Sequence, residues 1–320
     1  MESKKVEAVL SVLSFFQIFN CPLTRSEIYQ GVFGEADLEF TWNDLSVVLE
    51  DLLNKDVLVN ESGLYALNID RPPSALESRL KYQATFYLKA KRARRWAFFM
   101  SLFPGVRGVA VVNSVGFKLP SDNADIDFLI ITDEKSLYIS RLLVTFFLKI
   151  FGLRPTKQNQ KDKICTSFWL SEKNLNLEKI AYSDNDVYLY YWLLNVYPLY
   201  DQADYWERWQ SANFWLKNRL PNSHFRANIK KIQFGILARF WKRLGEIFFT
   251  HRFWNNWAKK LQYRFFSSDI KELMNKDTRV IVNDEMLKFH TVDNRQKYFD
   301  LYQENLKNSL NKYRYVAKEN

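Results

Sequence analysis

The sequence predicts a helix-rich α+β protein of three parts. Three helical segments and a short hairpin pattern open the chain, apolar strand-like runs follow a long helix in the middle, and helical periodicity dominates the rest. The predicted domains are residues 1–70, 71–182 and 183–320, and the last is a helical region rich in basic and aromatic residues. With 320 residues, of which 47 % are hydrophobic, the chain can bury substantial cores.

The first 70 residues have the element order of a winged helix. Apolar spacing predicts helices over 6–19, 25–32 and 42–54, followed by strands over 57–59 and 64–67. Thr24 and Glu27 form the pattern of a capping box at the start of the second helix.

The third helix of this domain is acidic. It carries Asp44, Glu50 and Asp51, and no basic residue precedes Lys55. Winged helices often bind DNA, but an acidic helix would be repelled by phosphates. A contact with protein or within the chain is therefore favoured, and DNA binding stays the alternative.

A long helix leads into the middle domain. Ser74 follows the break at 70–73 and is a candidate cap for a helix over 75–103, whose segment 89–95 is strongly basic. This segment can be a solvated face, or it can attract a polyanion. A short apolar strand is expected next, over 109–112.

The most informative motif comes directly after that strand. Asn113, Ser114 and Gly116 form a small polar turn, and Asp125 and Asp127 begin a second apolar strand about ten residues later. Alternation along a strand places the two carboxylates on one face and turns the residue between them toward a core. Paired carboxylates are ligands that Mg²⁺ prefers, although such a pair can also be a solvated strand end.

This arrangement resembles the DNA polymerase β-like nucleotidyltransferase superfamily, whose signature is Gly-Ser followed by Asp-x-Asp. The resemblance implies a central mixed sheet with helices, in which Asp125 and Asp127 bind one or two Mg²⁺ ions and the Ser114 turn holds the phosphates of a nucleoside triphosphate. Asn113 stands where the family has Gly, and Asn tolerates a positive φ better than other residues with a side chain.

The resemblance further implies a third carboxylate on a later strand. The strand expected over 163–170 has none in its interior, so Asp162 is chosen as the third catalytic acid. The implied activity is transfer of a nucleoside monophosphate from the donor, with ATP chosen for its abundance, to the hydroxyl of an RNA, a protein or a small molecule. The alternative is a catalytically degenerate interaction or regulatory protein that uses the winged helix and the basic tail to bind protein or nucleic acid.

The last domain is expected to be helical, over 186–195, 205–219, 226–266 and from Asp284 onward, with a strand-like run over 280–282 before the final helix. A basic region begins at Lys230 and ends at Phe266, and within it Ile236, Leu237 and Phe240 begin an apolar stripe at helical spacing. This helix can pack on the middle domain, contact nucleic acid or attach to an anionic membrane, so an anionic partner is a candidate here.

The remaining composition sets the expected compartment. Cys21 and Cys165 are far apart and form no metal or disulfide pattern, and His290 has no His or Cys nearby and is interpreted as structural. The chain opens without an apolar signal core, and no uncharged run is long enough to span a membrane. A reducing cytoplasm is the expected setting.

Overall fold

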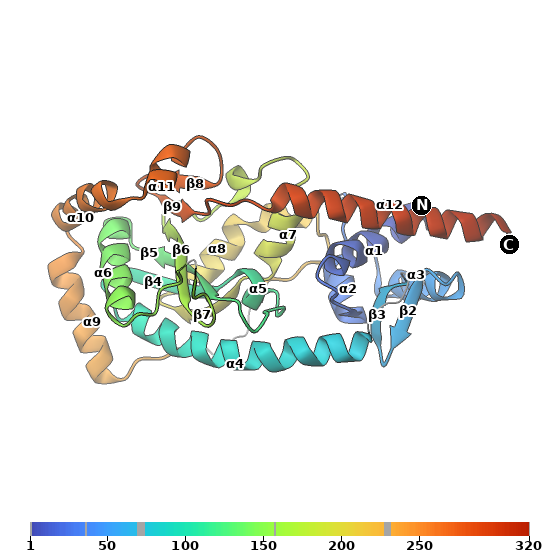
Figure 1. The fold of residues 1–320 in the computed structure, drawn as a ribbon, viewed down its shortest axis with the longest axis horizontal. Helices are drawn as coiled ribbons and strands as arrows, with labels where there is room; N and C mark the ends of the chain where they lie inside the picture. Colours follow the sequence, from blue (N-terminus) through green and yellow to red (C-terminus); the bar gives the residue numbers. More distant parts are fainter. Residues whose placement is uncertain (1, 36, 69–73, 157, 227–231, 320) are drawn as a thin grey trace.

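The computed structural model describes residues 2–35, 37–68, 74–156, 158–226 and 232–319 (Figure 1). The protein has a mixed α/β architecture, with one three-stranded sheet and one six-stranded mixed sheet among these residues. The helix-rich α+β class predicted from the sequence is confirmed at this level.

Three helices and the three-stranded sheet form the N-terminal unit. They are α1 (Glu2–Gln17), β1 (Leu23–Thr24), α2 (Arg25–Gly31), α3 (Trp42–Asn54), β2 (Leu58–Glu61) and β3 (Leu64–Leu67). The strands pair antiparallel in the order β1-β3-β2. Both α2 and α3 begin with a capping box, at Thr24 with Glu27 and at Thr41 with Asp44. The predicted helices and hairpin of this part are confirmed.

The long helix α4 (Ala75–Ser101) leads from this unit to the larger sheet, as Figure 1 shows. Ser74 caps it as predicted, because its hydroxyl accepts a hydrogen bond of 3.2 Å from the Glu77 N–H. The break predicted at 70–73, and with it the boundary between the first two predicted domains, lies outside the described residues.

The six-stranded sheet has the order β7-β4-β5-β6-β9-β8. Its strands are β4 (Val106–Val111), β5 (Ile126–Thr132), β6 (Ile164–Ser171), β7 (Tyr197–Asp201), β8 (Val280–Val282) and β9 (Met286–Phe289). The pair β5–β6 is parallel, and the other pairs are antiparallel.

Alternating side chains of the central strands supply two cores. Val109, Phe128 and Ile130 pack on one face with α4, α6 (Leu137–Ile150) and α10 (Arg252–Phe265). Ala110 and Leu129 belong to the other core, which also contains α7 (Val187–Leu194), α8 (Tyr205–Ala212) and α1. This two-sided burial explains why β4 and β5 have continuous apolar sequences.

The C-terminal part departs from the helical expectation. The strands β7, β8 and β9 come from this part, so the predicted boundary at 182/183 divides the sheet. The helix expected from Asp284 is wrong, because Met286–Phe289 is strand β9, and the last helix, α12, spans Arg295–Glu319. The turn before β9 is set by Asn283, whose side-chain oxygen accepts from the N–H groups of Glu285 and Met286 at 2.9 and 2.7 Å.

The helix expected over 226–266 is also wrong as one element. Lys230 lies outside the described residues. From Ile236 onward the segment forms two helices, α9 (Ile236–Phe249) and α10, which are separated at Thr250 and His251. The short helix α11 (Ser268–Leu273) follows. The helix expected over 205–219 also ends early: α8 stops at Ala212, and a 3₁₀ helix over Phe214–Asn218 follows it. Another 3₁₀ helix, over Glu178–Ile180, lies between β6 and α7.

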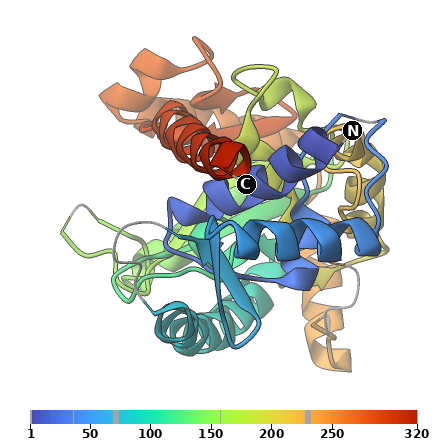
Figure 2. The same ribbon diagram turned by 90° about the vertical axis from the view of Figure 1, so that its right-hand side faces the viewer.

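The final helix α12 returns to the N-terminal unit, where it runs alongside α1 (Figures 1 and 2). The Asn305 amide donates a hydrogen bond of 3.1 Å to the Ser14 carbonyl. None of the helices in the described ranges has both the length and the apolar character needed to cross a membrane.

Candidate functional site

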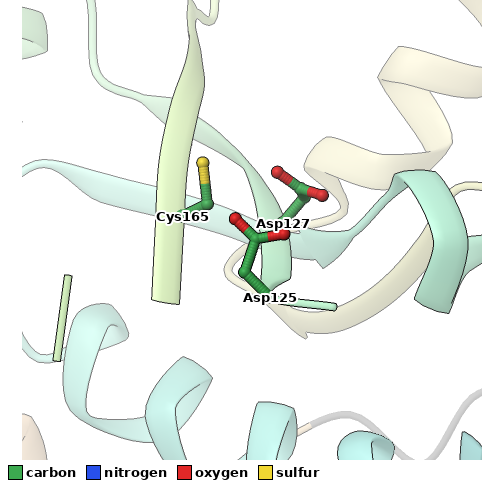
Figure 3. Close-up of side chains that lie close together, drawn as sticks. All are labelled: Asp125, Asp127 and Cys165. Atoms are coloured by element: carbon green, nitrogen blue, oxygen red, sulfur yellow. The ribbon is translucent and has the colours of Figure 1, made fainter. Parts of the chain in front are cut away.

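Asp125 and Asp127 lie at the start of β5, on one side of the central sheet. Their carboxylate oxygens and the thiol of Cys165 all lie within 4.8 Å of one another (Figure 3). The residue between them, Ile126, is fully buried on the opposite face. The alternation predicted from the sequence is therefore confirmed.

The third member of this group comes from the neighbouring strand. In the parallel β5–β6 pair, Cys165 is the register partner of Asp127. Burial raises the pKa of the Cys165 thiol, and so do the charges of Asp127 and Asp125, which keeps the sulfur protonated. A protonated thiol is a poor ligand for Mg²⁺, so only the two carboxylates of this group are suitable ligands for a hard cation. The Cys165 thiol donates a hydrogen bond to Asp127 instead.

The two carboxylates destabilise each other's charge. Burial raises the pKa of Asp127 to about 7, with a further contribution from the charge of Asp125, although Asn113 and Cys165 donate hydrogen bonds to it. Burial also raises the pKa of Asp125, and its own backbone N–H and the charge of Lys89 act in the opposite direction. A divalent cation between the carboxylates would remove this repulsion, so the residues present fit Mg²⁺.

Asn113 connects the turn after β4 to this pair. Its φ is 52°, the left-handed conformation that the sequence argument allowed for Asn at this position. Its side-chain oxygen accepts a hydrogen bond of 2.8 Å from the Trp192 indole, and its amide donates to Asp127. The Asn113 side chain therefore orients one of the two carboxylates.

Of the other two residues in this turn, only one faces the site. Ser114 lines the cavity beside Asp125 and Asp127. Gly116 does not line it, and its N–H donates to the Val112 carbonyl at 3.1 Å. A Cβ at Gly116 would lie 2.9 Å from the Asn195 carbonyl oxygen, so this glycine permits a close contact between backbone segments.

Asp162 is not brought together with the carboxylate pair. It pairs with Lys89 at 2.9 Å and with Arg92, both on α4. Although partial burial acts to raise its pKa, the hydrogen bonds from Arg92 and Lys89 hold it below the ordinary Asp value. Lys89 also donates to the carbonyls of Asp122 and Ala124, at 3.2 and 2.6 Å. The basic segment of α4 thus fixes the backbone that leads into Asp125.

Two polar residues that the sequence did not assign to the site lie in the same cavity, and one of them, His290, was interpreted as structural. The Ser167 hydroxyl and Nε2 of His290 are 2.9 Å apart, and both residues line the cavity. Burial lowers the pKa of His290 to about 3, and the charge of Lys288 contributes, so the imidazole is neutral. Alternation along β6 could have placed Ser167 beside Cys165, but no local signal predicts that β9 brings His290 to β6.

The cavity has a volume of about 780 Å³ and extends from the carboxylates to an aromatic wall. The wall is formed by aromatic side chains from α7, from α12 and from the segments that directly follow α1 and the short helix α5 (Asn113–Gly116): Phe19, Phe117, Tyr188, Trp192 and Tyr298. Tyr188 and Tyr298 are stacked, with ring centres 5.2 Å apart. This volume and these aromatic faces suit a planar ligand of nucleotide size.

The cations Lys288 and Arg295, which also line the cavity, have protein partners. Arg295 pairs with Asp186 at 2.8 Å and with Asp293 at 2.7 Å. Lys288 donates to the Thr278 carbonyl, and burial lowers the pKa of its ammonium group to about 8. These groups add positive potential beside His290 while remaining held by the protein.

Comparisons with known proteins identify no relative, since no family model, no curated protein and no solved structure matches the chain.

Proposed function

We propose that the protein is a Mg²⁺-dependent nucleotidyltransferase that moves a nucleoside monophosphate from a nucleoside triphosphate to an acceptor hydroxyl. The observation that carries the proposal is the placement of Asp125 and Asp127 side by side in a cavity large enough for a nucleotide. A buried pair of carboxylates is unfavourable without a cation, so its presence in a cavity favours a metal-binding role. In this proposal the six-stranded sheet is a polymerase β-like core and the N-terminal unit is a winged helix.

The proposed reaction assigns a task to each part of the cavity. The acceptor oxygen attacks the α-phosphorus of the donor, the bond to the bridging oxygen breaks, and pyrophosphate leaves. Asp125 and Asp127 would hold Mg²⁺, which would supply charge neutralisation at the phosphates and the leaving group. The Ser114 hydroxyl would donate a hydrogen bond to a phosphate oxygen, and Asn113 would keep Asp127 in position.

The acceptor hydroxyl must be oriented toward the α-phosphorus. Asp162 is held by Lys89 and Arg92, so we assign this task to Ser167 and His290. The Ser167 hydroxyl would accept a hydrogen bond from the acceptor and donate its own to Nε2 of His290, which burial keeps neutral, and the acceptor's proton would pass to water. The aromatic wall at Trp192 and Tyr188 would stack on the base of the donor. Because stacking does not select a base, ATP is proposed as the donor for its abundance.

A transfer assay tests this function. The full-length protein is incubated with each nucleoside triphosphate labelled at the α-phosphate and with RNA, protein and small-molecule fractions as acceptors. The proposal predicts Mg²⁺-dependent labelling of one fraction, which Asp127→Asn abolishes and His290→Ala strongly reduces. Labelling that Asp127→Asn leaves unchanged would contradict the assignment.

A second candidate function is a catalytically degenerate interaction or regulatory protein with the same fold. The position of Asp162, paired with two basic residues of α4 away from the carboxylates, favours it. In this case the winged helix and the basic tail would make the contacts. The helix α3 carries three acids and no Lys or Arg. Asp44 and Asp51 are paired with Lys5 and Lys55, and Glu50 is exposed. Because α3 itself offers no cation to a phosphate, this surface suits protein better than DNA.

A further inference from the structure

The helices α9 and α10 turn large apolar side chains toward solvent. We call this surface the apolar end face. Its members are between 46 and 79 % exposed: Ile236, Leu237, Phe240, Trp241, Ile247, Phe248, Phe253 and Trp257. A contiguous surface of this kind is costly in water and marks a site that another apolar phase or molecule covers.

The faces of α9 and α10 that contact the rest of the protein carry polar side chains, and their hydrogen bonds fix the two helices with the apolar side chains exposed to solvent. Lys242 of α9 is buried, and its ammonium donates to the carbonyls of Ser101 and Val106 and to the Tyr200 hydroxyl, at 2.9, 2.5 and 3.0 Å. Glu246, one turn further along, pairs with Arg107. Rotating α9 to bury its apolar side would break these contacts and leave buried polar groups without partners.

The next helix follows the same design. Asn255 is buried, and its side-chain oxygen accepts from the N–H groups of Tyr138 and Ile139 at 2.8 and 3.2 Å. Gln262 is also buried and donates to the Tyr138 carbonyl at 2.7 Å. Both helices are therefore fixed by polar contacts to the body of the protein, with their aromatic side chains directed away from it.

The exposed charges that α9 and α10 themselves carry are all positive, and the nearby acid Asp284 is paired with Lys259 of α10. Five basic residues of α9 and α10 are exposed: Arg239, Arg243, Arg252, Lys260 and Arg264. The one acid between 236 and 265 is Glu246, which is held on the inward side by Arg107. On the helical wheel of α9, Arg239 and Arg243 lie at one edge of the apolar stripe.

We infer that the apolar end face binds the surface of an anionic lipid bilayer. Apolar and aromatic side chains that enter the acyl boundary, with basic side chains at their edges for acidic headgroups, are the features of an interfacial helix. The two helices lie at one end of the long axis, opposite the N-terminal unit (Figure 1). This inference is independent of the proposed reaction.

The charge pattern argues against two other occupants. A second copy of the chain would place five exposed cations of each copy against those of the other, which opposes association. A nucleic acid would meet isoleucine, leucine and phenylalanine at the centre of the surface, where its phosphates need cations. An anionic bilayer satisfies both the apolar centre and the basic edge.

Vesicle co-sedimentation of the full-length protein tests the inference. The vesicles consist of phosphatidylcholine alone or of phosphatidylcholine with phosphatidylglycerol. We expect binding to the mixed vesicles, with a blue shift of tryptophan fluorescence, and weaker binding to the neutral ones and at high salt. The double substitution Phe240→Ser/Trp241→Ser should lower the partition coefficient at least about tenfold, because both side chains insert into the interface.

Matched variants separate the apolar and electrostatic contributions. Tyr87 and Leu88 of α4 are each 67 % exposed, so Tyr87→Ser/Leu88→Ser is the apolar control and should bind like the wild type. Arg239→Gln/Arg243→Gln should weaken binding to the mixed vesicles more than to the neutral ones. Since all these side chains are exposed, thermal melting should show that the variants are folded.

Three results would overturn the inference. The first is that wild type binds neither kind of vesicle, and the second is that it binds equally well after Phe240→Ser/Trp241→Ser. The third is a dimer in light scattering that this substitution converts to monomers, because a second copy would then cover the apolar end face.

Discussion

Replacing Asp127 by Asn should stabilise the protein in the absence of divalent cations. The carboxylate oxygens of Asp125 and Asp127 lie within 4.8 Å. Two unit charges at that separation repel by about 3.5 kcal/mol at an effective dielectric constant of about 20. The introduced amide would keep an oxygen that can accept from Asn113 and Cys165, so the substitution removes this repulsion together with the cost of burying the Asp127 charge. Allowing for relaxation of the site, we expect the free energy of unfolding to rise by about 1 to 3 kcal/mol at pH 8.

This gain should depend on pH in a defined direction. Burial and Asp125 raise the pKa of Asp127 from 3.8 to about 7. Between these values the folded protein binds a proton that the unfolded chain releases, so the stability of the wild type falls as the pH rises through this window. The difference between Asp127→Asn and wild type should therefore be small near the lower limit and reach its full size above the upper one.

Urea unfolding in a chelator across this pH range measures the effect. Asp300→Asn, at an exposed position on α12 far from the carboxylate pair in sequence, is the control and should change stability by less than about 0.5 kcal/mol. Added Mg²⁺ should raise the stability of the wild type and should have little effect on Asp127→Asn. A variant that is less stable than the wild type at pH 8, or one that Mg²⁺ stabilises equally, would refute the reasoning.

Three further predictions concern positions around the site and in the N-terminal unit. Lys89→Met should lower the free energy of unfolding by about 2 to 4 kcal/mol in urea titrations, because it leaves the carbonyls of Asp122 and Ala124 without their partner and removes one of the two cations that pair with Asp162. Ser114→Ala should weaken nucleotide binding by about 1 to 2 kcal/mol in calorimetry, with stability unchanged. Hydrogen bonds from Lys5 and from the Thr41 backbone lower the pKa of Asp44 to about 2, so the stability difference between wild type and Asp44→Asn should be present above about pH 4 and vanish as the pH falls toward 2.

The parts of the fold that the sequence predicted correctly depend on local rules. The start of α2 follows from the capping box of Thr24 and Glu27, and the extent of α3 follows from apolar spacing. The orientation of Asp125 and Asp127 follows from strand alternation alone. These are properties of a few consecutive residues, and the tertiary structure keeps them.

The parts that the sequence did not predict depend on contacts between distant segments. His290 reaches Ser167 through strand β9, which joins the sheet beside β6. The acid-rich turn before β9 resembled the start of a helix because Asp284 and Glu285 are common in first helical turns. Asp162 was chosen for its position before β6, and its capture by Lys89 of α4 follows from packing.

The helix α9 shows a second limit of sequence patterns. Its periodicity correctly predicts an amphipathic helix, but periodicity alone does not say which side faces the protein. Packing of the apolar side on the middle domain was one of the three expectations, and it is wrong for Ile236 and Phe240, which are 79 and 60 % exposed. The inward side is fixed by Lys242, whose three acceptors lie on other elements.

Isothermal calorimetry of nucleotide binding tests the central claim most directly. Each of the four nucleoside triphosphates is titrated into the wild type and into Asp125→Ala/Asp127→Ala, with Mg²⁺ and with a chelator. The account predicts that at least one nucleotide binds the wild type only with Mg²⁺ and that the double variant, which remains folded, does not bind it. No binding by the folded wild type, or binding that needs neither the metal nor the carboxylates, would contradict the proposed donor site.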